Sequence, residues 1–281
     1  MSIKTICVCG AGTMGRGIAQ VCAQSGFNTI LYELNTVVLK HASDALQKQL
    51  AVLAEKGKIG KGKDAEILKR IHFTSDISDC HADLVIEAII ENADAKRDLF
   101  KALSGVNGEE SIFATNTSSL PVNVIANAHT DPSRVIGLHF FNPAPVMKLV
   151  EVVTTASTDE GVLQIVLNLV KELGKTAVVC SDSPGFIVNR VARPYYIESL
   201  RLVEDGVIDP ATADSILEAT GFKMGPFRLM DLIGNDVNFA VSNSVYEQLN
   251  RPARLKPSYI QQEKVDSGEL GKKTGKGYYS Y

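Results

Sequence analysis

Short apolar runs alternate with amphipathic stretches over the first 180 residues of the chain. Several runs are apolar throughout, which is typical of strands buried on both faces of a sheet. We expect strands at residues 5–9, 29–33, 84–88, 112–115, 135–139, 149–153 and 176–180. Helices are predicted at 14–24 and 159–173, the second with Thr158 as N-cap and Gly174 at its end. This alternation indicates a Rossmann-type, doubly wound, mostly parallel sheet.

The strand pattern stops after "SDSPG" at residues 181–185. Residues 186–203 read as a long helix, and Asp209-Pro210 offers the N-cap and first residue of another helix that ends at Gly221. A further helix is predicted from Pro226. A chain of 281 residues exceeds the usual size of one hydrophobic core. We therefore predict an α/β domain at residues 1–183 and a smaller all-α domain at 184–281.

Composition narrows the class of protein. Hydrophobic residues at 45% and charged residues at 22% describe an ordinary folded chain, and the net charge of −3 argues against general nucleic-acid binding. The chain shows neither a secretory signal nor an apolar run of membrane-spanning length, so we expect no membrane partner. The five cysteines lack metal-ligand or disulfide-like spacing. We expect reduced thiols, no metal and a cytoplasmic location.

The stretch "GAGTMG" at residues 10–15 directly follows the first predicted strand and opens a helix. Gly10 permits a tight turn, Gly12 lets the backbone approach a pyrophosphate, and Gly15 allows close helix–strand packing. Glu33 follows at the end of the second strand, where a carboxylate binds ribose hydroxyls and repels a 2′-phosphate. The pattern favours NAD over NADP. The alternative is a structural glycine turn with a surface glutamate.

Seven motifs together carry a resemblance over essentially the whole chain. They are "GAGTMGRGIAQ" (10–20), "VIEAIIEN" (85–92), "ATNTSSL" (114–120), "GLHFFNPAPVMKLVEVV" (137–153), "DSPGFIVNR" (182–190), "GPFRLMDLIGNDV" (225–237) and "LGKKTGKGYYSY" (270–281). In this order they resemble the short-chain L-3-hydroxyacyl-CoA dehydrogenase family, and within it the bacterial 3-hydroxybutyryl-CoA dehydrogenases. The resemblance implies an NAD-dependent oxidoreductase that acts on an acyl-CoA, and a homodimer formed through the C-terminal helical domain.

The resemblance also assigns residues. It implies a catalytic pair at His139 and Glu151, and substrate contacts at Ser118 and Asn189, which complete the catalytic set. Dinucleotide contacts are expected at the glycine loop and at further positions along the chain: Gly10, Gly12, Thr13, Met14, Gly15, Glu33, Glu91, Lys96, Asn116, Asn142 and Lys273. Lys56 corresponds to a coenzyme A contact. Gln49 departs from the family pattern, which often has a serine there that touches coenzyme A.

The residues support the same chemistry without the family. Oxidising a secondary alcohol with NAD⁺ requires a base for the hydroxyl proton, and histidine titrates near neutrality. His139 ends a predicted strand at the ligand-binding edge of the sheet, and Glu151 lies twelve residues later in the next strand. A carboxylate there could fix the tautomer of the imidazole. The alternative is a core histidine bonded to a backbone carbonyl.

Polar residues follow another strand at "NTSS", residues 116–119. We assign Ser118 to the substrate oxygen and Ser119 to the cap of a helix near Pro121, with the amide of Asn116 nearby. Asn189 falls in the first turn of the long helix at 186–203. If its face meets the first domain, the active site lies between the domains. The lysine-rich segment 56–70 suits a polyanionic handle, although such runs are usually solvated surface.

These observations predict reversible interconversion of a short-chain (S)-3-hydroxyacyl-CoA, with 3-hydroxybutyryl-CoA as the expected substrate, and a 3-ketoacyl-CoA. Two alternatives keep the fold: a sugar-acid (gulonate-type) dehydrogenase, and a non-enzymatic, crystallin-like dinucleotide binder. The residues do not fix the acyl chain length, nor whether the acyl group carries a second carboxylate.

Overall fold

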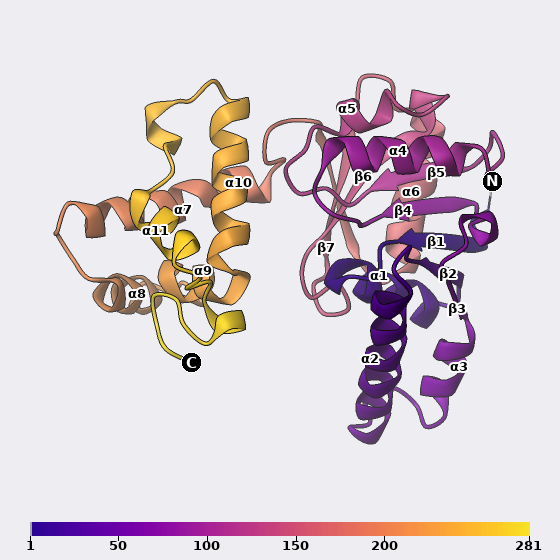
Figure 1. The fold of residues 1–281 in the computed structure, drawn as a ribbon, viewed down its shortest axis with the longest axis horizontal. Coiled ribbons are helices and arrows are strands. Elements are labelled where there is room, and N and C mark those ends of the chain that lie inside the picture. The colour runs from indigo at the N-terminus through magenta and orange to yellow at the C-terminus, as the bar shows by residue number, and fades with distance from the viewer. Residues whose placement is uncertain (1) are drawn as a thin grey trace. The chain divides into compact units, whose positions relative to one another are not determined.

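The computed structural model describes residues 2–281, which form two compact units. The first unit ends at Asp182 and the second begins at Ser183 (Figure 1). Each unit has its own hydrophobic clusters, so each is described by itself.

The N-terminal unit alternates strands with helices along the chain. Its strands are β1 (Thr5–Cys9), β2 (Asn28–Tyr32), β3 (Ile71–Thr74), β4 (Leu84–Glu87), β5 (Ile112–Thr115), β6 (Val135–Phe140), β7 (Leu149–Thr154) and β8 (Thr176–Ser181). Its helices are α1 (Thr13–Gln24), α2 (Thr36–Glu55), α3 (Lys63–Lys69), α4 (Ala93–Ser104), α5 (Val122–Ala126) and α6 (Glu160–Glu172). The predicted alternation is confirmed.

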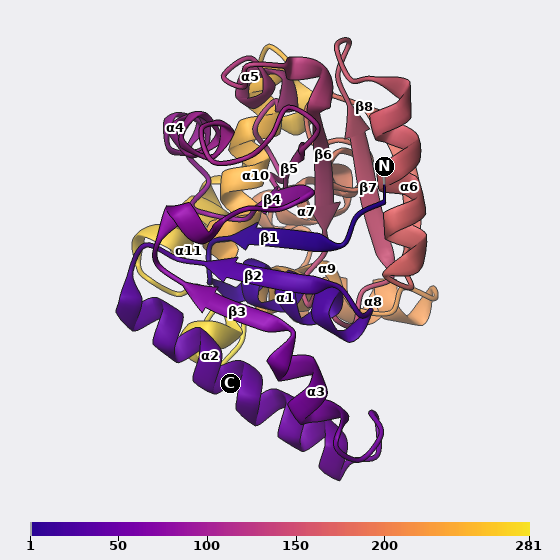
Figure 2. The same ribbon diagram turned by 90° about the vertical axis from the view of Figure 1, so that its right-hand side faces the viewer.

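The eight strands form one sheet in the order β3-β2-β1-β4-β5-β6-β7-β8 (Figure 2). Strands β1 to β6 are parallel, β7 runs antiparallel to β6, and β8 is parallel to β7. The predicted Rossmann-type, mostly parallel sheet is therefore confirmed. The chain leaves β1 towards β2 on one side and β4 lies on the other, which makes the carboxyl end of β1 the topological switch point where such sheets bind ligands.

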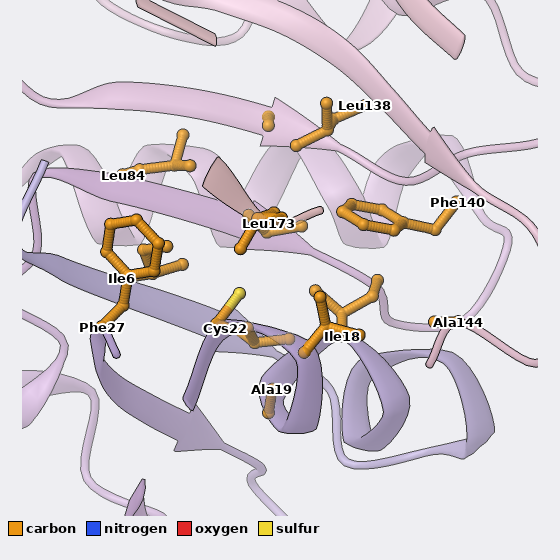
Figure 3. Close-up of a cluster of buried hydrophobic side chains, with 14 of the residues drawn as sticks. Ile6, Ile18, Ala19, Cys22, Phe27, Leu84, Leu138, Phe140, Ala144 and Leu173 are labelled. Carbon is orange, nitrogen blue, oxygen red and sulfur yellow. The ribbon is translucent and has the colours of Figure 1, made fainter. Parts of the chain in front are cut away.

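Alternating residues of the strands serve two different cores. Ile6 and Val8 of β1 pack with α1, α2 and α6, whereas Cys7 and Cys9 pack with α4 and α5. Figure 3 shows the first core, where Ile18 of α1 lies against the sheet. Helices thus cover both faces, which explains why the sequence of the central strands is apolar throughout.

The start of α6 and the strand β3 differ from what the sequence predicted. The N-cap of α6 is Asp159, whose carboxylate accepts from the backbone N–H of Val162, whereas the hydroxyl of Thr158 donates to the carbonyl of Val135. Strand β3 was not predicted, because it is four residues long and two of its side chains are partly or fully exposed. A short edge strand of this kind has no apolar pattern to reveal it.

The C-terminal unit is helical. Its helices are α7 (Val188–Glu204), α8 (Pro210–Ala219), α9 (Pro226–Ile233), α10 (Asn235–Gln248) and α11 (Tyr259–Asp266). Asp209 caps α8 and Pro210 opens it, as predicted. Helix α7 begins two residues later than predicted, because Phe186 has a φ of 49° and does not continue a helix.

The last residues of the chain are bound to a buried carboxylate. Asp231 is 1% exposed, and it accepts hydrogen bonds from the backbone N–H groups of Tyr278 and Tyr279, both at 3.0 Å, and from the hydroxyl of Tyr281 at 3.2 Å. A Cβ atom on Gly277 would lie 2.0 Å from the same carboxylate, so only glycine fits there. The aromatic C-terminal segment is therefore an integral part of the helical unit.

Candidate functional site

The glycine loop has the geometry that a dinucleotide requires. Gly10 has a φ of +101°, and a Cβ there would lie 2.6 Å from the carbonyl oxygen of Ala88, just after β4. A Cβ on Gly15 would lie 1.8 Å from the carbonyl oxygen of Gly10, whereas a Cβ on Gly12 would meet nothing within 4 Å. Gly10 and Gly15 therefore serve packing, and Gly12 leaves open space for a ligand.

The first turn of α1 also suits a phosphate group. No side chain caps it, and its N-cap is Gly12. Thr13 is exposed and Met14 is half-buried in this turn. Because the first N–H groups of a helix lack intrahelical partners and carry partial positive charge, they bind anions well. The loop thus fits the pyrophosphate of NAD.

Glu33 lies directly after β2, beside the glycine loop. Its carboxylate accepts from the backbone N–H of Ala11 at 3.0 Å and from that of Asn35 at 3.0 Å. These two bonds hold the side chain at the switch point. The carboxylate is therefore fixed next to the loop in which the ribose of a bound dinucleotide would lie.

His139 and Glu151 form a buried pair. They stand directly opposite each other in the antiparallel β6–β7 ladder, and Nδ1 of His139 lies 2.7 Å from Oε2 of Glu151. His139 is 5% exposed and Glu151 is 0% exposed. The ring of Phe141 lies 4.6 Å from the imidazole, centroid to centroid. The arrangement can hold the histidine in the tautomer in which Nδ1 donates to the carboxylate and Nε2 carries the lone pair.

Glu91 organises the loop that carries Ser118. Its Oε1 atom accepts from the hydroxyl of Thr117 at 2.6 Å, from the backbone N–H of Ser118 at 3.1 Å, and from the hydroxyl of Ser119 at 3.0 Å. The predicted cap at Ser119 is therefore wrong, and α5 begins after Pro121 without a side-chain cap. The loop that carries Ser118 is therefore held by Glu91, which follows the neighbouring strand β4.

Lys96 lies beneath this loop and is only 1% exposed. Its ammonium contacts Glu87 at 2.6 Å and Glu91 at 3.1 Å. Burial acts to raise the pKa of Glu91, but the charge of Lys96 and the hydrogen bond from Thr117 outweigh it and hold the pKa below its ordinary value. The side chain of Lys96 is thus committed to two carboxylates, and its contact with the cofactor stays a prediction.

The ends of β5 and β6 are joined through Asn116. Its Oδ1 atom accepts from the backbone N–H of Phe140 at 2.8 Å, next to His139. Asn142 is exposed at the start of the turn between β6 and β7. This turn packs against α1, since a Cβ on Gly17 would lie 3.2 Å from the Cβ of Ala144. The glycine loop, the serine loop and the histidine are therefore connected along one edge of the sheet.

The remaining predicted residues lie away from this edge or in the other unit. Lys56 is exposed at the C-cap of α2. Asn189 lies in the first turn of α7, and its backbone carbonyl accepts from Nε of Arg193 at 2.9 Å. Lys273 belongs to the short 3-10 helix Lys272–Thr274 and pairs with Asp236 at 2.6 Å. The latter two belong to the C-terminal unit.

Two residues with a clear part in the site were not predicted. Thr117 donates to Glu91, and Glu87 accepts from Thr115 at 2.7 Å as well as from Lys96. Thr115 ends the apolar strand β5 and Thr117 follows it two residues later, and this alternation was a signal for polar contacts on one face. Residues 2–281 contain no group of three or more side chains that could hold a metal, and none of their helices could cross a membrane.

Known protein families match the chain over almost its full length. The model of the 3-hydroxyacyl-CoA dehydrogenase NAD binding domain matches residues 5–183, and that of the 3-hydroxyacyl-CoA dehydrogenase C-terminal domain matches residues 185–281.

Individual relatives agree with these matches. The chain is 44% identical to the 3-hydroxyadipyl-CoA dehydrogenase of Escherichia coli strain K12, with 100% of this chain and 60% of that protein covered. It is 41% identical to a probable 3-hydroxybutyryl-CoA dehydrogenase of Deinococcus radiodurans, with 98% and 99% covered. A crystal structure of 3-hydroxybutyryl-CoA dehydrogenase from Escherichia coli K12 superimposes with a TM-score of 0.96 at 45% identity, and covers 100% of this chain and 60% of that one.

Proposed function

The chain belongs to the 3-hydroxyacyl-CoA dehydrogenase family, and from this we propose that it interconverts a short-chain (S)-3-hydroxyacyl-CoA and the corresponding 3-ketoacyl-CoA with NAD. The expected pair is 3-hydroxybutyryl-CoA and acetoacetyl-CoA. The observation that carries the proposal is the buried contact of 2.7 Å between His139 and Glu151 at the carboxyl edge of the sheet. A carboxylate-bound histidine there serves a reaction that needs a proton acceptor.

The chemistry of the pair follows from its hydrogen bond. With Nδ1 donating to Glu151, the Nε2 atom of His139 accepts the proton of the 3-hydroxyl group. The negative charge of Glu151 stabilises the imidazolium that forms. NAD, when bound, supplies the carbon that accepts the hydride from C3 of the substrate. In the reverse direction the imidazolium returns the proton to the 3-oxygen.

The other predicted residues hold the reactants. We propose that Ser118, on the loop fixed by Glu91, donates to the substrate oxygen, and that Asn189 of the C-terminal unit donates to the 3-oxygen or to the thioester carbonyl of the substrate. Glu33 binds the ribose hydroxyls, and the N–H groups at the start of α1 bind the pyrophosphate. Lys56 is proposed to contact the phosphates of coenzyme A.

The assembly and location of the protein also belong to this proposal. We assign substrate binding and dimerisation to the C-terminal unit, and we expect a homodimer in the cytoplasm. Exposed apolar side chains on this unit support a covered surface, among them Val191, which is 73% exposed, and Val207, which is 63% exposed. Light scattering on the purified protein gives the mass that tests the dimer.

The decisive experiment is a set of steady-state measurements with NADH. Acetoacetyl-CoA should oxidise NADH rapidly and NADPH poorly. Glu33→Ala should weaken the binding of NADH more than the binding of NADPH. His139→Gln should lower turnover by roughly 10²–10⁴-fold while NADH still binds. No turnover of acetoacetyl-CoA with NADH, but reduction of NAD⁺ by a sugar acid, would favour the gulonate-type reaction. NADH binding without turnover of either substrate would leave the crystallin-like alternative.

A further inference from the structure

Arg193 is a buried cation in α7 that has no carboxylate partner within residues 2–281. It is 2% exposed. Its Nε donates to the carbonyl of Asn189 at 2.9 Å, and its Nη1 donates to the carbonyl of Asn238 at 3.0 Å and to the hydroxyl of Ser242 at 2.9 Å. The ring of Tyr196 lies 4.8 Å from the guanidinium carbon. Every one of these partners is neutral.

A charge in this position is costly for the fold. Burial lowers the pKa of Arg193 to about 10, so the guanidinium is still charged at neutral pH. Buried charges are normally paired with an opposite charge, because desolvation is not offset by neutral acceptors alone. The described part of the chain leaves this cation without its anion. An anion supplied by a ligand would remove the imbalance.

The side chain of Arg193 lies beside the residue of this unit that is proposed to contact the substrate. Side chains of a helix lean towards its N-terminus, and the bond from Nε of Arg193 to the carbonyl one turn earlier places the guanidinium alongside Asn189. Asn189 is the residue of this unit that the proposed function places at the substrate. The two N–H groups of Nη2 receive no acceptor from the described chain, so they remain as donors.

A second polar group nearby is also incomplete. Asn238, whose carbonyl accepts from Arg193, is 1% exposed. Its side-chain oxygen accepts from Gln261 at 3.1 Å, while its side-chain nitrogen has no hydrogen-bond partner. Buried polar groups are nearly always paired. Arg193 of α7 and Asn238 of α10 thus each have an N–H donor without an acceptor in the described chain. A bound ligand with acceptor oxygens could accept hydrogen bonds from these donors.

We propose that Arg193 is a specificity-determining residue that binds a carboxylate at the far end of the acyl group, so that the preferred substrates are coenzyme A thioesters of 3-hydroxy dicarboxylic acids. The inference rests on the proposed dehydrogenase function, and it changes the preferred substrate from 3-hydroxybutyryl-CoA to acyl groups that end in a carboxylate. Once the 3-oxygen and the coenzyme A handle have their contacts, the end of the acyl group is the part of the substrate left to be recognised. A guanidinium binds a carboxylate more strongly than it binds any neutral group.

The test uses two substrates of equal chain length. The ketones 3-oxoadipyl-CoA, which ends in a carboxylate, and 3-oxohexanoyl-CoA, which ends in a methyl group, are compared by kcat/KM with NADH. The wild type should prefer 3-oxoadipyl-CoA by about 10- to 100-fold, the range expected for a hydrogen bond to a charged group. Arg193→Gln should abolish this preference and leave the rate with 3-oxohexanoyl-CoA within about threefold.

A matched control lies on the same helix. Arg201 donates to Glu198 at 3.2 Å and is partly exposed, so Arg201→Gln should keep the preference of the wild type. If Arg193→Gln does not fold, Arg193→Lys keeps the cation with a different reach and should reduce the preference in part. A variant that keeps the full preference overturns the proposal.

The substrate comparison in the wild type tests the idea independently of any variant. Equal kcat/KM for the two ketones would overturn the carboxylate site while the proposed dehydrogenase function stands. An equal loss on both ketones in Arg193→Gln would assign Arg193 to the fold rather than to specificity. If neither ketone nor acetoacetyl-CoA oxidises NADH, the proposed function itself has failed.

Discussion

Replacing Glu151 with glutamine tests the electrostatic part of the proposed mechanism. The substitution keeps the size of the side chain and an oxygen that can accept from Nδ1 of His139, but it removes the negative charge 2.7 Å away. Both residues are buried, so water screens their interaction poorly. The change therefore removes the stabilisation of the imidazolium while it disturbs the geometry little.

The expected magnitude follows from the distance. Two unit charges about 4 Å apart, measured between charge centres, interact by about 4 kcal/mol at an effective dielectric constant of about 20. Since about 1.4 kcal/mol corresponds to a factor of ten in rate, the full loss would be close to 10³-fold. The amide dipole of glutamine restores part of this energy. We expect kcat to fall by about 10²–10³-fold.

The assay is NADH oxidation at saturating acetoacetyl-CoA, with NADH affinity measured separately by fluorescence. NADH binding should change by less than about threefold, because Glu151 touches the histidine and not the nucleotide loop. The control is Glu160→Gln in the exposed first turn of α6, where Glu160 bonds only Gln164; its kcat should equal that of the wild type. A kcat for Glu151→Gln within threefold of the wild type would refute the electrostatic argument.

Three further outcomes are expected. Gly12→Ala should weaken NADH binding by about tenfold or more without lowering the melting temperature, whereas Gly15→Ala, whose Cβ would lie 1.8 Å from a carbonyl oxygen, should destabilise the fold in thermal unfolding. The lowered pKa of Glu91 means that its charge stabilises the fold well above pH 4.5 and that this stability is lost as the pH falls through the folded-state pKa. In urea titrations the difference in unfolding free energy between wild type and Glu91→Gln should therefore shrink at acid pH, and a constant difference would contradict the assignment. Asp231→Asn should lower the free energy of unfolding by about 2–4 kcal/mol in urea titrations, because two partly buried N–H groups of the C-terminal segment lose a charged acceptor; an unchanged midpoint would show that the segment is not held there.

The large elements were predictable because burial leaves a direct trace in the sequence. The runs at β1, β4 and β5 are apolar on both faces, and the alternation with helices fixes the class of fold. The predicted family and NAD as its cofactor are confirmed by the matches to both domains. Helix ends were harder, since Thr158 and Asp159 are both good caps and only the local backbone decides between them.

The site was predictable in its residues but not in its connections. His139 and Glu151 could be expected to lie near each other, yet their direct opposition depends on how the turn after Phe141 folds. Glu91 could be noticed after a strand, but its bonds to the Ser118 loop join two segments that are 27 residues apart. Such contacts depend on tertiary packing, which short-range patterns do not contain. The chemical roles of these residues stay predictions.

The antiparallel pairing of β6 and β7 makes the register of two strands part of the candidate site. Strand residues alternate between faces, so a shift of this register by one residue would move Glu151 to the opposite face of the sheet and place a valine opposite His139. A shift by two residues would restore the face but move the carboxylate along the strand by two positions. The turn between Phe140 and Leu149, which carries the contact to α1, can therefore change in composition without loss of the pair as long as the register is kept. A variant that retains both His139 and Glu151 but pairs the two strands in another register would lose the contact between them.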